Sequence, residues 1–225
     1  MTASVFARQV APRLLRSAAA AVVTCLPVAV LTVIVTRGWD PLARLDERTI
    51  RSATDVTRAH PLLFDALIAW QEAFQPWHVY LVAAMAAGVV WRAALRARAA
   101  WGLATMVVGW NLGLQVKLLV ERARPVYDDP VSSAPGFSFP SGHAFNTAMA
   151  TGTVLVMAWP LLVRRPRPTR VALVAAAVVV VALTAADRVF LGVHFPTDVT
   201  AGVLLAAGLT SASYAGFRYR PRETP

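Results

Sequence analysis

Six long runs of apolar residues, separated by polar and charged segments, dominate the chain. They cover residues 17–36, 77–91, 99–120, 142–163, 169–186 and 196–214. A helix needs about 20 apolar residues to cross roughly 30 Å of hydrocarbon, so each run is a candidate transmembrane helix. The second run is short and is expected to extend past Trp91. The pattern predicts an all-α polytopic integral membrane protein with a six-helix transmembrane bundle.

The first run has two interpretations. Arg8, Arg13 and Arg16 precede an alanine-rich stretch, as they would in a secretory signal. The apolar core of a signal peptide is usually about 7 to 15 residues long, and this run is longer. An uncleaved first helix is therefore the favoured interpretation.

The polar segment 37–76 lies between the first two runs. Leu42, Leu45 and Ile50 recur at near-helical spacing, and the apolar stretch 62–74 follows, interrupted by Asp65, Gln71 and Glu72. Such amphipathic patterns are typical of helices that lie in the membrane interface. We expect one or two interfacial helices on the outer leaflet, with a poorly ordered loop as the alternative.

Composition supports the membrane class. The chain has 225 residues, of which 57% are hydrophobic and 15% are charged, whereas soluble domains average about a quarter charged residues. The length suits one domain. Cys25 is the single cysteine, which excludes an intramolecular disulfide framework.

The basic residues alternate between segments in a way that predicts topology. Segments 1–16, 92–98, 164–170 and 216–225 hold 13 basic residues and one acidic residue, while the alternate segments hold 9 basic and 11 acidic residues. The positive-inside rule places the first set in the cytoplasm. We therefore expect a cytoplasmic basic N-terminal segment (1–16), a membrane domain (17–215) and a cytoplasmic basic tail (216–225). The net charge of +10 then reflects topology. A nucleic-acid partner is not expected, because no cluster of base-stacking aromatic residues lies beside the arginines.

Tryptophans support the boundaries of the spans. Trp39, Trp77, Trp91, Trp101 and Trp159 fall near the predicted ends, where amphipathic rings favour the headgroup layer.

Lys117 and Arg124 form a first polar cluster at the outer end of the third run. Seven helical residues turn by about 700°, so the two cations are expected to project in nearly the same direction. Two cations facing one spot suit a multiply charged anion. Lys117 is the only lysine in a chain that otherwise uses arginine, which indicates a compact ammonium placed for its geometry. The alternatives are snorkelling toward lipid headgroups and neutralisation of Lys117 by Glu121.

A second cluster, Pro140 to His143, opens the fourth run. Ser141 is expected to cap the helix, Gly142 allows a ligand to approach the backbone, and the free N–H groups of the first turn form an anion site. Helix initiation alone explains proline, serine and glycine. It does not explain His143, an imidazole at the start of an apolar helix.

A third cluster precedes the sixth run and contains Arg188, His194 and Asp198. If the chain is helical from His194, Asp198 lies on the same face at i+4; otherwise Asp198 or Thr197 is the N-cap. A carboxylate that accepts from one imidazole nitrogen leaves the other free to attack. The alternative is a capped helix beside an interfacial histidine.

All three clusters fall on the predicted outer face. Three cations, a helix N-terminus and two imidazoles are the groups that metal-free phosphoryl transfer requires, because positioning and charge stabilisation supply most of that catalysis.

The stretches KLLVERARP (117–125), PSGH (140–143) and RVFLGVHFPTD (188–198) resemble the three-part signature of the type 2 phosphatidic acid phosphatase (PAP2) superfamily, in particular its membrane lipid-phosphatase branch. The three pieces occur in order with matching internal spacing, and the resemblance covers residues from about 77 to the sixth run.

The resemblance implies a role for each matching residue. His194 resembles the nucleophile that forms a phosphohistidine, Asp198 its orienting partner, and His143 the general acid. The residues that resemble the phosphate cradle are Lys117, Arg124, Ser141, Gly142 and Arg188. No metal or other cofactor is implied.

One position departs from the family pattern, because Asp187 stands where a serine is usual. A carboxylate there would repel phosphate, so we expect Asp187 to turn away and pair with an arginine. The chemistry needs His194 neutral and His143 protonated, which predicts a bell-shaped pH profile with pKa values on either side of about 6.5.

Together these features predict a bacterial cell-membrane enzyme that hydrolyses a lipid phosphate at the outer face. Candidate substrates are undecaprenyl diphosphate, phosphatidic acid and phosphatidylglycerol phosphate. The alternatives are a phosphotransferase that uses the same phosphohistidine and a non-catalytic lipid-phosphate binder or transporter subunit. A vanadate-dependent haloperoxidase would share the anion cradle, but a small bundle embedded in lipid does not favour it.

Overall fold

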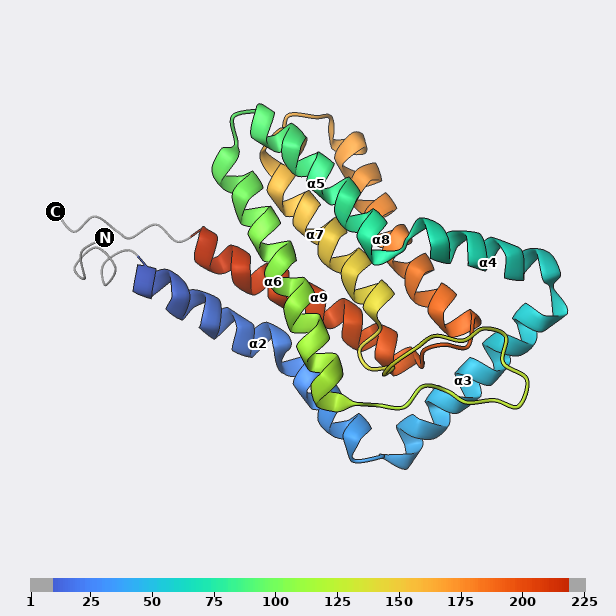
Figure 1. The fold of residues 1–225 in the computed structure, drawn as a ribbon. Coiled ribbons are helices and arrows are strands. Elements are labelled where there is room, and N and C mark those ends of the chain that lie inside the picture. Colours follow the sequence, from blue (N-terminus) through green and yellow to red (C-terminus); the bar gives the residue numbers. More distant parts are fainter. Residues whose placement is uncertain (1–9, 219–225) are drawn as a thin grey trace.

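The computed structural model describes residues 10–218, and the regular structure in this range is helical (Figure 1). Most of the predicted N-terminal segment 1–16 and tail 216–225 lies outside the described residues. The eight helices are α2 (Ala11–Thr36), α3 (Asp40–Ala59), α4 (Pro61–Ala73), α5 (Pro76–Arg92), α6 (Arg96–Val120), α7 (Gly142–Leu162), α8 (Arg167–Phe190) and α9 (Pro196–Phe217).

Prolines and one serine determine where most helices begin. Proline occupies the first or second position of six helices, where its missing N–H costs nothing. Helix α7 begins instead after Ser141, whose side chain accepts from the Ala144 N–H. Each apolar run predicted from the sequence corresponds to one helix, although α2 starts at Ala11 and is longer than predicted.

Among residues 10–218, five helices are long and apolar enough to cross a bilayer: α2, α6, α7, α8 and α9. Helix α5 has only 17 residues. Helices α4 and α5 together are long and apolar enough to cross a bilayer, with a bend of 51° between them. The all-helical prediction is confirmed, while the sixth span stays a prediction.

Segment 37–76 is helical in the structure, so the loop alternative was wrong. It forms α3 and α4, which lie away from the two ends of the described chain (Figure 1). Helix α3 buries one face against the bundle, where Ile50 packs in a cluster with Ala144, Val189 and Val199. The Thr57 hydroxyl donates to the Phe190 carbonyl at 2.8 Å. Helix α3 therefore covers the adjoining ends of α7, α8 and α9.

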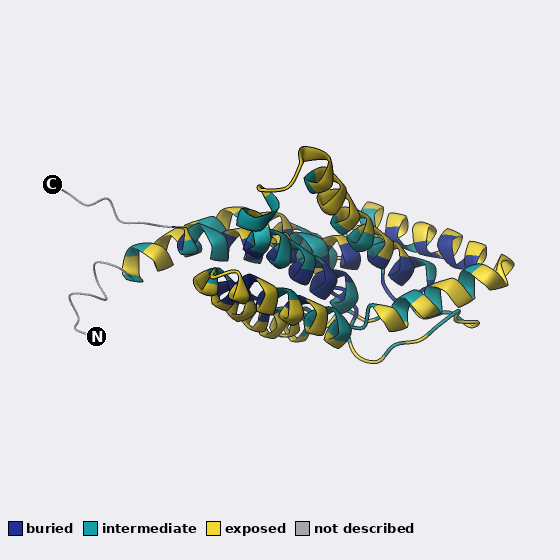
Figure 2. Cartoon of the chain, turned by 90° about the horizontal axis from the view of Figure 1, so that it is seen from above, coloured by how far each residue is buried: buried dark blue, intermediate teal, exposed yellow. Residues whose placement is uncertain are grey.

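Helices α7 and α9 bury more residues than any other helix of the described range, whereas α2 buries only Val28. The buried residues lie in the interior of the bundle, and the exposed ones on its outer faces (Figure 2). Helix α9 approaches its neighbours closely at glycines. A Cβ at Gly202 would lie 2.9 Å from the Ser141 carbonyl oxygen, and one at Gly208 would lie 3.0 Å from the Thr24 carbonyl oxygen. Small residues at such crossings let the backbones of membrane helices come into contact.

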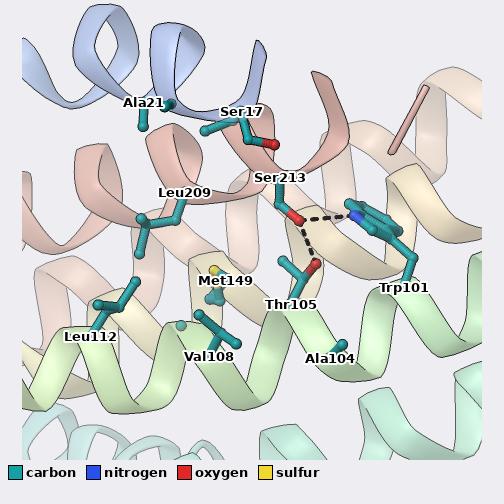
Figure 3. A pocket seen from close by; sticks show the side chains of 13 residues that line it. Ser17, Ala21, Trp101, Ala104, Thr105, Val108, Leu112, Met149, Leu209 and Ser213 are labelled. Carbon is teal, nitrogen blue, oxygen red and sulfur yellow. Dashed lines mark hydrogen bonds between the residues drawn. The ribbon is translucent and has the colours of Figure 1, made fainter. Parts of the chain in front are cut away.

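Trp101 differs from the other tryptophans that we placed at the membrane interface. Its ring is only 9% exposed, and its Nε1–H donates to Ser213 Oγ at 2.9 Å (Figure 3). It lines a cavity of about 400 Å³ between α2, α6, α7 and α9. The interfacial interpretation of Trp101 was therefore wrong, because the ring packs inside the bundle against Tyr214 and Phe217.

We expect Gly202→Ala to lower the free energy of unfolding by about 1–3 kcal/mol, because the added methyl group would meet rigid backbone. Gly88→Ala is the matched control: this glycine is also helical, but a Cβ there would meet nothing within 4 Å. Thermal midpoints in detergent should fall for Gly202→Ala and stay level or rise for Gly88→Ala. Equal midpoints would contradict the close α7–α9 contact.

Candidate functional site

The site forms where the end of α6, the loop 121–141, the start of α7 and the α8–α9 connection meet. The loop is fastened to itself, because the Ser138 N–H donates to the Arg122 carbonyl at 2.8 Å and its hydroxyl donates to the Ala123 carbonyl at 2.9 Å. The Ser141 N–H in turn donates to the Asp198 carbonyl at 2.9 Å, which joins the starts of α7 and α9.

Lys117 and Arg124 converge on the same part of this loop. Lys117 Nζ donates to the Phe137 carbonyl at 2.8 Å, and Arg124 Nε donates to the neighbouring Gly136 carbonyl at 3.0 Å. The helical argument for their convergence was wrong, because α6 ends at Val120 and Glu121 turns the chain with a left-handed φ of 49°. Arg124 reaches the site from the loop.

Neither of these two cations is neutralised by a carboxylate within residues 10–218. The ion pairs of this range leave out Lys117 and Arg124, and none joins Lys117 to Glu121. Both side chains are half-buried and donate hydrogen bonds to backbone carbonyls, whose dipoles offset the positive charge only weakly. Asp198 attracts both cations from a distance, but no carboxylate of this range pairs with them directly, so the spot between them keeps a positive charge that suits an anion.

The second cluster lies at the N-terminus of α7 as predicted. Ser141 is the N-cap of the helix, and a Cβ added to Gly142 would meet nothing within 4 Å, so the space in front of its backbone is open. His143 Nε2 is buried and has no hydrogen-bond partner. The ring is within electrostatic range of Arg188, His194, Lys117 and Arg124, so this imidazole shares one site with the cations.

Asp198 takes a position that differs from both sequence alternatives. Helix α9 begins at Pro196 with Phe195 as its N-cap, so His194 precedes the helix and Asp198 lies in its first turn. Asp198 Oδ2 accepts the Phe195 N–H at 2.9 Å and lies 3.5 Å from His194 Nδ1. The carboxylate therefore caps the helix from within and faces the imidazole at the outer limit of hydrogen-bond length.

The contacts of His194 determine its tautomer. Arg124 Nη1 lies 3.1 Å from His194 Nε2, and a guanidinium can only donate. Nε2 must then accept, which puts the proton on Nδ1, the nitrogen that faces Asp198. The unprotonated nitrogen therefore points its lone pair toward the cations, on the side where a nucleophile would meet a bound phosphate.

Burial lowers the pKa of His194 to about 4. The Asp198 carboxylate opposes this effect, while Arg124 and Lys117 add to it. The ring is only 3% exposed, so loss of hydration outweighs the attraction of the carboxylate for the imidazolium. His194 is therefore neutral at pH 7.

Arg188 and Asp187 pair with each other, which confirms that Asp187 binds an arginine. Arg188 Nε donates to Asp187 Oδ2 at 2.7 Å, and Nη2 contacts the same oxygen. Both residues are buried, and Asp187 Oδ1 has no partner. Asp187 thus neutralises one of the three cations expected to bind phosphate, and Lys117 and Arg124 provide the uncompensated charge.

Sequence reasoning missed two residues at the third cluster, Arg122 and Asp46. Arg122 Nη1 donates to Asp198 Oδ1 at 2.6 Å and to Thr197 Oγ1 at 2.7 Å, and Nη2 donates to Asp46 Oδ2 at 2.9 Å. Asp46 had a detectable signal, because it shares the apolar face of α3 with Leu42 and Ile50 at spacings of four residues. Arg122 had none beyond its place between Lys117 and Arg124.

No three His, Cys, Asp or Glu side chains of residues 10–218 come together as a group that could hold a metal ion.

Comparisons with known proteins match the family that the three motifs resemble. A family model described as the PAP2 superfamily matches residues 93–222. Phosphatidylglycerophosphatase B of Bacillus subtilis (strain 168) is 37% identical over 93 residues, which cover 40% of this chain and 43% of that protein. Decaprenylphosphoryl-5-phosphoribose phosphatase of Mycobacterium tuberculosis (strain CDC 1551 / Oshkosh) is 37% identical over 123 residues, covering 52% of this chain and 60% of that protein. The matched region thus spans less than two thirds of either relative.

The fold also matches a solved structure. The crystal structure of a transmembrane PAP2 type phosphatidylglycerolphosphate phosphatase from Bacillus subtilis aligns with a TM-score of 0.74 and 24% identity. The alignment covers 89% of this chain and 98% of that one. The likeness establishes a shared membrane-protein fold.

Arg124→Gln should weaken the binding of inorganic phosphate about 10- to 100-fold, the loss expected for a hydrogen bond to a charged group. The measurement is the rise in thermal midpoint with increasing phosphate. Arg44→Gln is the control, because Arg44 is an exposed arginine paired only with Asp40 on α3. If Arg124→Gln kept the full phosphate-dependent rise, the anion site would be elsewhere.

The His194 ring should titrate near pH 4, well below an ordinary histidine at about 6.5. The pKa of His194 is lowered because burial favours the neutral imidazole, so that a lower pH is needed to protonate it. NMR of isotopically labelled histidine in detergent would measure the midpoint, with His194→Ala identifying the resonance among four histidines. A midpoint at or above 6.5 is incompatible with the dehydrated site described above.

Proposed function

Because this chain belongs to the PAP2 superfamily, we propose that it is a membrane lipid phosphatase that hydrolyses a phosphomonoester or diphosphate lipid through a phosphohistidine. The observation that carries the proposal is the placement of His194 Nε2, a neutral nitrogen with its lone pair 3.1 Å from Arg124 Nη1. A phosphoryl group bound to Arg124 would lie next to this nitrogen. The nucleophile and the anion site are therefore adjacent.

Binding comes first. The phosphate oxygens replace the carbonyl contacts of Lys117 and Arg124 and release His194 Nε2 from the guanidinium. Arg188, Ser141 and the backbone N–H of Gly142 complete the cradle at the start of α7. The positive charge of this group stabilises the oxygens as charge spreads over them in the transition state.

Transfer then follows in two steps. The Nε2 lone pair of His194 forms a bond to phosphorus while the bond from phosphorus to the leaving oxygen breaks, and His143 donates a proton to that oxygen. Asp198 stabilises the imidazolium that forms. A water molecule next attacks phosphorus and gives its proton to His143, the N–P bond breaks, and phosphate leaves with His194 restored.

Several features support a lipid as the substrate and the cell membrane as the location. Five helices have the length and apolarity to span a bilayer, and the relatives reported above are named for lipid phosphates. The positive-inside rule, applied to the basic segments, supports a topology with both termini in the cytoplasm and the site at the outer face. Undecaprenyl diphosphate, phosphatidic acid and phosphatidylglycerol phosphate are the substrates to compare. No metal is required in this scheme, because protein cations neutralise the phosphoryl oxygens.

His194→Ala should reduce phosphate release from these lipids by about a thousandfold or more, as removal of a nucleophile does elsewhere. The assay measures inorganic phosphate from purified protein in detergent, with a chelator and without added alcohol. His60→Ala, which changes an exposed histidine, is the control. Wild-type protein quenched during turnover should contain an acid-labile phosphoenzyme that the variant lacks.

Three outcomes would contradict the proposal. Full activity of His194→Ala would exclude the nucleophile. A strict requirement for a divalent metal would exclude the charge scheme. Turnover that occurs only with an added alcohol acceptor would identify a phosphotransferase.

A further inference from the structure

We propose that Asp46 of α3 and Arg122 are positioning residues, which fix the rotation of the Asp198 carboxylate so that one oxygen faces His194. This inference rests on the proposed function for its catalytic meaning. Neither residue is expected to touch the substrate.

Arg122 divides the two oxygens of Asp198 between different tasks. Its Nη1 donates to Oδ1 at 2.6 Å, while Oδ2 accepts the Phe195 N–H at 2.9 Å and faces His194 Nδ1 at 3.5 Å. With Oδ1 held by the guanidinium, the carboxylate cannot rotate away from the imidazole without losing a charge-assisted hydrogen bond. The guanidinium also lies 4.2 Å from the centre of the Phe195 ring, which restricts its own position.

Asp46 holds Arg122 in turn and ties α3 to α9. Its Oδ2 accepts from Arg122 Nη2 at 2.9 Å and also from the Thr197 hydroxyl, and its Oδ1 accepts the Thr197 N–H at 3.0 Å. The same carboxylate thus binds the guanidinium and one of the free N–H groups in the first turn of α9. Helix α3, which we predicted to be interfacial, contains none of the proposed catalytic residues. It is nevertheless connected to the Asp198 carboxylate through Arg122.

Because both carboxylates are buried, they depend on Arg122 to compensate their charge. Asp46 is 1% exposed and Asp198 is 0% exposed, so both carboxylates are removed from water. Arg122 is the cation that contacts both of them. Buried charges need such a partner, and removing it leaves the remaining charges without compensation. Apolar packing of Ile50 and Ala53 beside Ala144 and Val199 keeps α3 in place over the site.

The charged and titratable groups near the His194–Asp198 pair come from five parts of the fold. They are Asp46 from α3, Lys117 from α6, Arg122 and Arg124 from the loop, His143 from α7, and Asp187 and Arg188 from α8. Asp46→Asn removes one negative charge from this set, and Arg122→Gln removes one positive charge. The two changes should therefore move the His194 pKa in opposite directions.

The test compares Asp46→Asn and Arg122→Gln with wild type. Each should lower kcat about 10- to 100-fold, the effect of misplacing a catalytic group by about an ångström, with KM changed only a few-fold. Glu47→Gln is the matched control for Asp46→Asn, because Glu47 is the next residue on α3, carries the same charge and pairs with Arg51 at the surface. Arg51→Gln is the corresponding control for Arg122→Gln.

The second readout is the NMR titration of His194, which does not depend on turnover. Arg122→Gln should raise the midpoint, because a cation near the imidazolium is lost. Asp46→Asn should lower it, because Arg122 then acts with less compensation. Arg122→Lys should restore the midpoint without restoring kcat, because it keeps the charge but lacks the second donor.

The outcomes separate this inference from the proposed function. Wild-type kcat in Asp46→Asn and Arg122→Gln, or midpoints that stay unchanged or move together, would overturn the positioning role even if His194→Ala is inactive. If Arg122→Gln does not fold, Asp46→Asn and Arg122→Lys decide the question. Opposite shifts of the midpoint in a protein without phosphatase activity would overturn the proposed function and keep the arrangement of the three residues.

Discussion

The site depends on holding cations out of water without a carboxylate to neutralise them. Lys117 and Arg124 are half-buried and bind the carbonyls of loop 121–141, whose dipoles only partly compensate their charge. A bound oxyanion would satisfy these cations better than the carbonyls do. Burial keeps His194 neutral, and the positive charge of Arg124 and Lys117 adds to this effect, so the charge that attracts phosphate also helps to preserve the lone pair that would attack it.

The bundle makes this arrangement possible by bringing helix ends together outside its apolar centre. Gly202 lets α9 contact the start of α7, and the Ser141 N–H binds the Asp198 carbonyl across the same crossing. The two helices therefore present their first turns side by side. His143 and Asp198 gain fixed positions from this backbone contact, which does not depend on the flexible ends of their own side chains.

The sequence was sufficient to predict the long helices and that the three motifs come together, but not the paths by which their residues meet. Apolar runs predicted the long helices because a bilayer imposes a minimum length. The convergence of Lys117 and Arg124 was predicted on a helix, whereas a left-handed turn at Glu121 ends α6 and a loop delivers the arginine. Local spacing cannot reveal such a turn at a residue that is not glycine.

Long-range pairs were the least predictable features. The pairing of Asp187 with an arginine was expected from charge alone, but its partner proved to be Arg188, its immediate neighbour. The contact between Asp46 and Arg122 joins residues 76 positions apart, and the apolar face of α3 gave the only sequence signal for it. Trp101 was misplaced because its position near a span end does not show whether the ring faces lipid or protein.

The most direct measurement is an experimental structure of the protein with orthovanadate, which mimics a phosphoryl group in transfer. We expect vanadium bonded to, or in contact with, His194 Nε2, and its oxygens hydrogen-bonded to Lys117, Arg124 and Arg188. Vanadate bound away from Nε2, or bound without Lys117 and Arg124, would contradict the claim that one cationic site aligns phosphate with the imidazole.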